Sequence, residues 1–269
     1  MKRLLFVMDR SEIAGPSLAL SLNLARGLRA SLSILRVTDP VLKELDAQVP
    51  YDHKAEVAAI AAGKIDRQLA EAMRAALRVK VACRPLVSSG DVCAAIMAEA
   101  DEADMIIIGR KGPGATLAYG MSDAIAESFL RQVPVPVVMA GKQTRRVRNI
   151  LVAFDGQHGS LKAMSVILNL AVFWRGDPLI PRVLCVGSDT ETQAIAEQAQ
   201  KLADARSVKI GMIRDTGTPE EAIVRVVEEK EIDLLAMGVY SKTPLHQRLF
   251  GSVTRHLLSA VECSMLACH

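Results

Sequence analysis

The sequence carries one order of apolar segments twice, and this repetition limits the fold more than any other feature. Each copy begins with a short apolar run that ends in an aspartate, and helix-like and strand-like segments then alternate. A β-α-β-α-β-α-β-α-β order predicts a parallel sheet with helices on both faces, because the crossovers are right-handed. We therefore expect an α/β protein with two tandem doubly wound domains of five parallel strands each, at residues 1–141 and 148–269. The aligned positions are Asp9 with Asp155, Val37 with Val186, Gly109 with Gly238, and 134–139 with 262–267.

Apolar runs and helical spacing place the elements of the first copy. The expected strands are 4–8, 31–37, 79–87, 105–108 and 133–139. The expected helices are 18–28, 53–77, 91–100 and one that carries Ile125 and Phe129. Because Pro134 and Pro136 cannot donate to a ladder on both sides, the last strand is expected at a sheet edge.

The second copy follows the same scheme. The expected strands are 149–154, 182–186, 208–213, 232–237 and 263–268, and the expected helices are 162–171, 191–205, one after Thr218 and one that carries Leu257. Thr218, Pro219 and Glu221 predict a helix start with a threonine cap and a closed capping box. The strands that end the two copies can pair with each other or with a second chain, so an intramolecular pseudo-dimer and a homodimer are both open.

Composition limits the class of protein. The length of 269 residues suits two domains, and a half-apolar composition argues for a globular protein. The net charge of +3 is small and does not call for nucleic acid as a partner. The run of Arg145, Arg146 and Arg148 is interpreted as a solvated linker. No apolar run is long enough for a membrane span, and Asp9 ends the signal-like start too early.

The five cysteines are odd in number and irregularly spaced, so we interpret them as reduced thiols of a cytoplasmic protein. Trp174 is the only tryptophan and is interpreted as a core or domain-contact residue.

The stretch 234–252 of the second copy has the character of a phosphate-binding loop. An apolar strand leads into Gly238, a polar segment follows, and Gly251-Ser252 opens the next helix. Amides at a helix start point at an anion, so Ser252 and Val253 are candidates for phosphate contact. In doubly wound sheets the ligand lies beyond the carboxyl ends of the strands, where the strand order reverses. The candidate residues are Asp155, Val186, Gly238, Val239, Ser241, Gly251, Ser252 and Val253.

These residues resemble the universal stress protein family in its tandem form, over nearly the whole chain. The family signature is G-x2-G-x9-G-[S/T] after the fourth strand, and the second copy reads Gly238-x2-Ser241-x9-Gly251-Ser252. The resemblance implies the Rossmann-like fold of the adenine nucleotide alpha hydrolases and an ATP site. It implies that the aspartate and the end of the second strand flank ribose and adenine, and that the glycines and Ser/Thr take the phosphates.

The first copy departs further from the signature. It reads Gly109-x2-Gly112-x9-Ser122-Asp123, and a carboxylate at Asp123 would repel a phosphate. The weaker candidates of this copy are Asp9, Val37, Gly109, Gly112 and Ser122. We expect nucleotide in the second copy and a structural role for the first.

Several readings stay open at this point. Asp155 holds ribose hydroxyls, or Mg²⁺ bridging to phosphates, or it only caps a helix. The ligand is ATP, with or without Mg²⁺, or AMP or ADP. The protein is a nucleotide-binding regulatory or stress-response protein, a scaffold or interaction module without nucleotide, or a slow ATP hydrolase. No catalytic signature such as G-x4-G-K-[S/T] or G-x-S-x-G is present, so an enzyme is not the leading interpretation.

Overall fold

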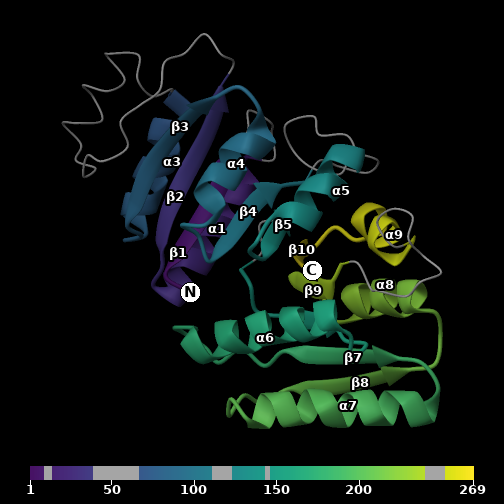
Figure 1. The fold of residues 1–269 in the computed structure, drawn as a ribbon. Coiled ribbons are helices and arrows are strands. Elements are labelled where there is room, and N and C mark those ends of the chain that lie inside the picture. The colour runs from purple at the N-terminus through teal and green to yellow at the C-terminus, as the bar shows by residue number, and fades with distance from the viewer. Residues whose placement is uncertain (9–13, 39–66, 111–122, 143–145, 240–251) are drawn as a thin grey trace.

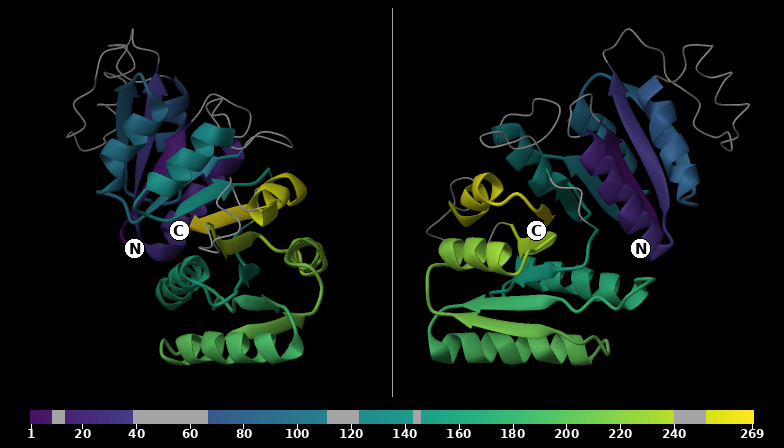
Figure 2. Two further views of the ribbon diagram at one scale, coloured as in Figure 1. Left: turned by 45° about the vertical axis from the view of Figure 1, so that its right-hand side comes forward. Right: turned by 180° about the vertical axis from the view of Figure 1, so that it is seen from behind.

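The computed structural model describes residues 1–8, 14–38, 67–110, 123–142, 146–239 and 252–269. These residues form one ten-stranded sheet with helices on both faces (Figures 1 and 2). The strand order is β3-β2-β1-β4-β5-β10-β9-β6-β7-β8, so each half has the same internal order of third, second, first, fourth and fifth strand. The predicted α/β class with two doubly wound, five-stranded units is confirmed.

Each half contributes five strands and, among the described residues, four helices. The first half has β1 (Arg3–Met8), α1 (Ala14–Leu28), β2 (Ser31–Thr38), α3 (Arg67–Arg78), β3 (Cys83–Ser89), α4 (Val92–Ala100), β4 (Met105–Gly109), α5 (Asp123–Gln132) and β5 (Val137–Ala140). The second has β6 (Ile150–Ala153), α6 (His158–Phe173), β7 (Arg182–Val186), α7 (Asp189–Asp204), β8 (Gly211–Asp215), α8 (Pro219–Glu229), β9 (Leu234–Gly238), α9 (Ser252–Ala260) and β10 (Ser264–Cys268). Residues 53–66 of the expected long helix lie outside the described residues.

The halves join through β5 and β10, which pair antiparallel while the pairs within each half are parallel. Val138 is in register with Leu266, and Met139 with Met265. Both strands are therefore internal to the ten-stranded sheet, and the expectation of an edge holds only within each half. Pro134 and Pro136 precede the ordered strand, so they remove no ladder bond between β5 and β10. The intramolecular pseudo-dimer is confirmed, and a homodimer stays a prediction.

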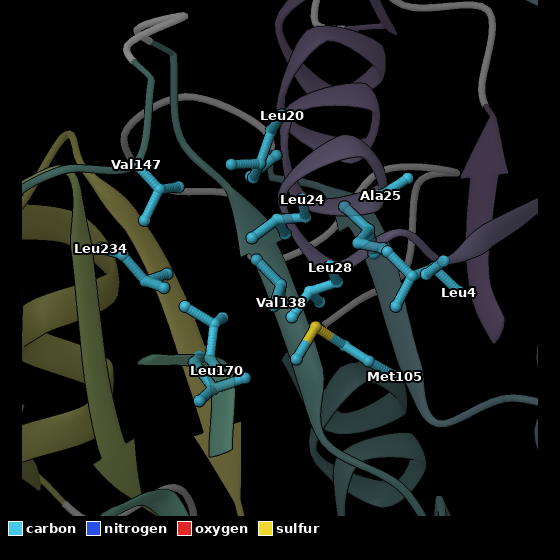
Figure 3. Packing of buried hydrophobic residues seen from close by; sticks show 14 of the residues in the cluster. Leu4, Leu20, Leu24, Ala25, Leu28, Met105, Val138, Val147, Leu170 and Leu234 are labelled. Atoms are coloured by element: carbon cyan, nitrogen blue, oxygen red, sulfur yellow. The ribbon is translucent and has the colours of Figure 1, made fainter. Parts of the chain in front are cut away.

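Two apolar cores lie on the two faces of the sheet, and each runs across both halves. Alternate residues of β1 divide between them: Leu4 and Phe6 face one core, and Leu5 and Val7 face the other. The first core packs under α1, α3, α6 and α7, and the second under α4, α5, α8 and α9. In Figure 3, Leu24 of α1 lies near Val138 of β5. Burying each such leucine or valine contributes about 1.5–3 kcal/mol.

The third strand of each half begins later than the sequence pattern indicates. β3 starts at Cys83 and β8 at Gly211, because the preceding helix ends in a left-handed residue, Lys80 (φ 59°) or Ser207 (φ 54°). The next N–H then folds back onto the helix: Val81 donates to the Ala76 carbonyl and Val208 to the Ala203 carbonyl, both at 3.0 Å. These apolar residues belong to helix C-caps rather than to strands.

The predicted helix start at Thr218 is correct, but the capping box is not. Pro219 occupies the first turn of α8, and the Thr218 hydroxyl donates to the Glu221 carboxylate at 2.8 Å instead of capping a backbone N–H. A complete capping box occurs at Ser188 and Glu191, at the start of α7. No helix in the described part of the chain is long and apolar enough to cross a membrane.

Candidate functional site

Three strand ends of the second half meet at the point where the strand order reverses. Ala153 of β6 is in register with Met237 of β9 on one side and with Leu184 of β7 on the other. Asp155 and Val186 each lie two residues beyond this line, and Gly238 lies one residue beyond it. The three candidates from separate parts of the sequence therefore come together at one carboxyl edge, as the switch-point rule predicts.

Asp155 is exposed and held in place by local hydrogen bonds. Its Oδ1 accepts from the Gln157 N–H at 2.9 Å and from the hydroxyl of buried Ser160 at 2.5 Å. The Ser160 hydroxyl also lies 3.0 Å from the Gln157 carbonyl oxygen. The residue at the cap position of α6 is Gln157, which makes no side-chain cap bond. Asp155 is thus an aspartate-turn residue two positions before the cap, rather than the cap itself.

The second carboxylate oxygen of Asp155 has no hydrogen-bond partner among the described residues. An oriented, exposed carboxylate oxygen can accept hydrogen bonds from ligand hydroxyls. The described residues contain no group of three or more His, Cys, Asp or Glu side chains that could hold a metal alone. One carboxylate fits Mg²⁺ only in the form that shares the ion with ligand phosphates.

The packing around Gly238 leaves no room for a side chain. A Cβ on Gly238 would lie 2.5 Å from the carbonyl carbon of Gly159 and 2.5 Å from the Ser160 nitrogen, both backbone atoms of α6. The first turn of α6 therefore rests directly on the end of β9. This contact explains the glycine without a ligand, and it also fixes the Asp155 turn beside the end of β9.

Val186 and Val239 contribute apolar surface near this edge. Val186 ends β7 and is partly buried against the second core, and Gly187 follows it with a φ of 154°. Val239 is 1% exposed, and its N–H donates to the Cys268 carbonyl oxygen at 2.7 Å. The amide of Val239 is consequently engaged within the protein.

Ser241 and Gly251 lie outside the described residues, as do Asp9, Gly112 and Ser122 of the first copy. Ser252 and Val253 form the start of α9, where the backbone is helical. Their predicted role in phosphate binding stays a prediction.

The corresponding edge of the first half differs by two buried arginines that the sequence analysis missed. Val37 and Gly109 lie at the ends of β2 and β4 and are buried. Beside them, Arg36 is 2% exposed and donates to the Met8 carbonyl at 3.3 Å. Arg110 is 4% exposed and donates to the Val261 carbonyl of the second half and to the Met265 sulfur.

Aligning the two copies gives the signal for these arginines. The residues at the corresponding positions of the second half are Cys185 and Val239, so two cations replace a thiol and an apolar side chain. Burial lowers the pKa of Arg110, and nearby Cys263 and Glu262 raise it. Arg110 connects the end of β4 to the C-terminal end of α9, so the first edge is tied into the junction between the halves.

Comparison with known proteins agrees with this architecture. The model of the universal stress protein family matches residues 1–141 and 186–269. A universal stress protein of Synechocystis, Slr1230, is 30% identical over 166 residues, which are 61% of this chain and 57% of that protein. The chain thus spans little more than half of that relative's length.

Solved structures extend the similarity to nearly the full chain. A universal stress protein from Archaeoglobus fulgidus superposes with a TM-score of 0.75 at 18% identity, over 99% of this chain and 97% of that one. A Pseudomonas aeruginosa protein of unknown function, PA1789, gives 0.64 at 17% identity, over 100% and 92%. At these identities the structures support the fold alone. By its two matched segments and its repeated sheet, the chain belongs to the universal stress protein family in its tandem form.

Proposed function

We propose that the protein binds an adenine nucleotide at the carboxyl edge of its second half and acts as a regulatory or stress-response protein. The observation that carries this proposal is Asp155: one carboxylate oxygen is fixed by Gln157 and Ser160, and the other is exposed at the switch point. An exposed acceptor held in a defined orientation suits the two hydroxyls of a ribose.

The other candidates supply the remaining parts of such a site. Val186 offers an apolar flank for the adenine ring. The signature residues Gly251, Ser252 and Val253 would bind phosphates through backbone amides and a hydroxyl at the start of α9. Mg²⁺ bound with ATP would neutralise phosphate charge, and Asp155 would share its coordination. AMP and ADP fit the same ribose and adenine contacts.

In this proposal the first half is a structural partner. Asp123 stands where the signature needs a hydroxyl, and two unit charges about 4 Å apart repel by several kcal/mol at a surface-like dielectric. The repeated fold would persist without a ligand there, because the sheet and both cores continue across the halves.

A scaffold without nucleotide is the second candidate function. The close contact between Gly238 and Gly159 accounts for the first signature glycine by packing alone, and the Val239 amide is already bonded to Cys268. In this case the loops at the carboxyl edge would contact a protein partner. A slow ATP hydrolase is the third candidate function. It would bind nucleotide as the regulatory protein does and would differ from it only in releasing phosphate.

Nucleotide carried through purification tests these candidates. Protein purified without added ligand and then denatured should release adenine nucleotide. Gly251→Asp should abolish the release by placing a carboxylate among the phosphates, while Ser122→Asp, which introduces the same residue at the aligned position of the first copy, should not. Nucleotide lost in Ser122→Asp and kept in Gly251→Asp would place the site in the first half. No release from the wild type, and no binding of added ATP by calorimetry, would favour the scaffold.

Turnover separates binding from hydrolysis. With Mg²⁺ and ATP, the first proposal expects phosphate release far below ordinary enzymatic rates, since no positioned base or arginine finger is evident in the sequence. Rapid release that Gly251→Asp removes would identify a hydrolase.

A further inference from the structure

A pocket of about 510 Å³ lies at the junction of the two halves, away from the candidate nucleotide site. It is lined by the last turns of α1, by the linker before β6 and by the segment that follows α6. Each of these helices begins at the carboxyl edge of the sheet and returns to the amino edge, so the pocket lies at the opposite edge from Asp155.

The three segments are fixed to one another. The ring of Trp174 lies against the backbone of Gly27, so closely that a Cβ there would overlap it. The Arg175 N–H donates to the Gly27 carbonyl at 2.7 Å, and the Val147 N–H donates to Asn23 Oδ1 at 3.1 Å. The pocket is therefore a built feature of the contact between the halves, and Trp174 is the domain-contact residue that the sequence indicates.

Four arginines line this pocket: Arg26, Arg146, Arg148 and Arg175. The carboxylate in its lining is that of Asp177, whose side chain is 93% exposed and lies 3.9 Å from Arg148. The side chains of the other three arginines make no hydrogen bond or ion pair with any described residue. Arg26 lies in the last turn of α1, where a cation interacts favourably with the helix dipole, but this accounts for one of the four.

The remaining polar side-chain groups add donors rather than acceptors. The indole N–H of Trp174 has no acceptor in the described part of the chain, and the acceptor oxygen of Asn23 already receives the Val147 N–H. A guanidinium offers five N–H donors in a planar fork that matches phosphate oxygens. A ligand for this pocket must supply negative charge and several acceptors.

We infer that this pocket binds a small multivalent oxyanion that carries at least two phosphate groups. Its volume lies within the usual range for small-molecule sites. Arginines from three separate segments suit linked phosphates better than a single one, because each group can meet a different guanidinium. Such a ligand contacts α1 and the segment after α6 at once, so its binding stabilises the junction of the halves. Arg146 and Arg148 of the basic run, which the sequence analysis interprets as a solvated linker, then contribute directly to a binding site.

Trp174 makes the test direct, because it is the only tryptophan of the chain. Inorganic pyrophosphate, titrated at constant ionic strength, should change its fluorescence saturably, and orthophosphate should bind at least about tenfold more weakly. Arg146→Gln and Arg175→Gln should each raise the Kd for pyrophosphate about tenfold. Arg78→Gln, which removes the same charge from an exposed position at the end of α3, should leave the Kd unchanged. Calorimetry of the same four proteins reports binding independently of the tryptophan signal.

The proposal is overturned if neither method detects saturable pyrophosphate binding, or if all three variants weaken it equally. Stronger binding of a short DNA duplex than of pyrophosphate would also overturn it and would indicate a nucleic-acid surface. Gly251→Asp should leave pyrophosphate binding in this pocket intact. The test of the pocket is therefore independent of whether the second half binds nucleotide.

Discussion

Gly238 and Gly159 touch through their backbones, with no side chain between the end of β9 and the start of α6. A Cβ built on Gly159 would lie 2.9 Å from Gly238 Cα and 3.2 Å from the Cys268 carbonyl oxygen. Real Cβ atoms rarely approach backbone this closely, and a backbone obstacle cannot rotate away as a side chain can. The contact places the Asp155 turn and the signature strand end side by side.

Gly238→Ala should therefore destabilise the protein. An added methyl group against the α6 backbone is an overpacking change, with an expected loss of about 1–3 kcal/mol in the free energy of unfolding. Gly15→Ala is a matched control, since a Cβ at this helical position meets no atom of the described residues within 4 Å, and the change should be neutral or slightly stabilising. Urea denaturation of both variants measures the difference. Equal stability would mean that α6 shifts without cost.

Ser160→Ala should weaken nucleotide binding without removing Asp155. The Ser160 hydroxyl donates to Asp155 Oδ1, so its loss lets the carboxylate rotate, and we expect an affinity loss of about fivefold for ATP. Asp155→Ala should cost at least as much. Calorimetric titration with ATP measures both. Unchanged affinity in both variants would contradict a role for this carboxylate in binding.

Arg110→Ala should loosen the junction of the halves. It removes a buried side chain and leaves the Val261 carbonyl without its donor, at an expected cost of about 2–4 kcal/mol in unfolding free energy. Arg110→Met should recover at least half of this loss, because it restores volume without burying a charge. Thermal and urea unfolding measure the order of the two variants. If the methionine variant is no more stable than the alanine variant, the lost hydrogen bond rather than the lost volume accounts for the contribution of Arg110.

The hydrogen bonds to the Asp104 carboxylate predict that the protein loses stability in acid. Partial burial raises the pKa of this carboxyl, but the N–H groups of Lys2 and Arg3, which donate to it at 2.6 and 2.9 Å, bring the net pKa below its ordinary value of 3.8. The nearby charges of the N-terminal amine and Arg3 act in the same direction. The stabilisation is therefore present above pH 4 and is lost as the pH falls through the folded-state pKa.

Asp104→Asn should reduce stability by only about 1 kcal/mol at neutral pH, because the group is only partly buried and solvent screens it, and the deficit should vanish in acid. Unfolding free energies measured from about pH 7 down to about pH 2 give this profile. Asp101→Asn, at an exposed helix end nearby, controls for the loss of one surface carboxylate. A deficit for Asp104→Asn that persists below pH 3 would contradict the role of its charge.

The thiols should resist alkylation while the protein is folded. Burial raises the pKa of Cys83, Cys185 and Cys263 to about 11 and that of Cys268 to about 12. Because the thiolate is the reactive form, two units of pKa slow alkylation at pH 8 roughly a hundredfold relative to the unfolded chain. Labelling with iodoacetamide, followed by mass spectrometry with and without urea, measures this ratio. Fast native labelling of Cys268 would show that β10 opens readily.

The repeated elements could be predicted because buried parallel strands read as short continuous apolar runs, such as Ile106 to Ile108. Helix ends were less predictable. Val79 and Val208 are apolar and β-branched, but a left-handed residue folds the chain back at each of these helix ends, and only backbone geometry reveals this. Pairing of β5 with β10 was one of two alternatives, since a sequence does not say which chain supplies the partner strand.

The switch-point rule brought Asp155, Val186 and Gly238 to one edge from sequence order alone. It did not reveal that Ser160 orients the carboxylate, because a serine five residues away has no distinctive spacing. The buried arginines were missed for another reason. Arg36 and Arg110 occur in strand-end positions where charge usually indicates solvent, and tertiary contacts with backbone carbonyls make their burial possible.

The antiparallel ladder between β5 and β10 has a consequence for how the two halves can diverge. Two separate chains joined by such a ladder would dissociate on dilution. Both would therefore have to keep an interface that is strong enough to persist at low concentration. Covalent linkage instead gives the partner strand an effective concentration of the order of millimolar. Association then survives substitutions that would dissociate a free dimer, so the carboxyl edge of one half can change without separating that half from the other.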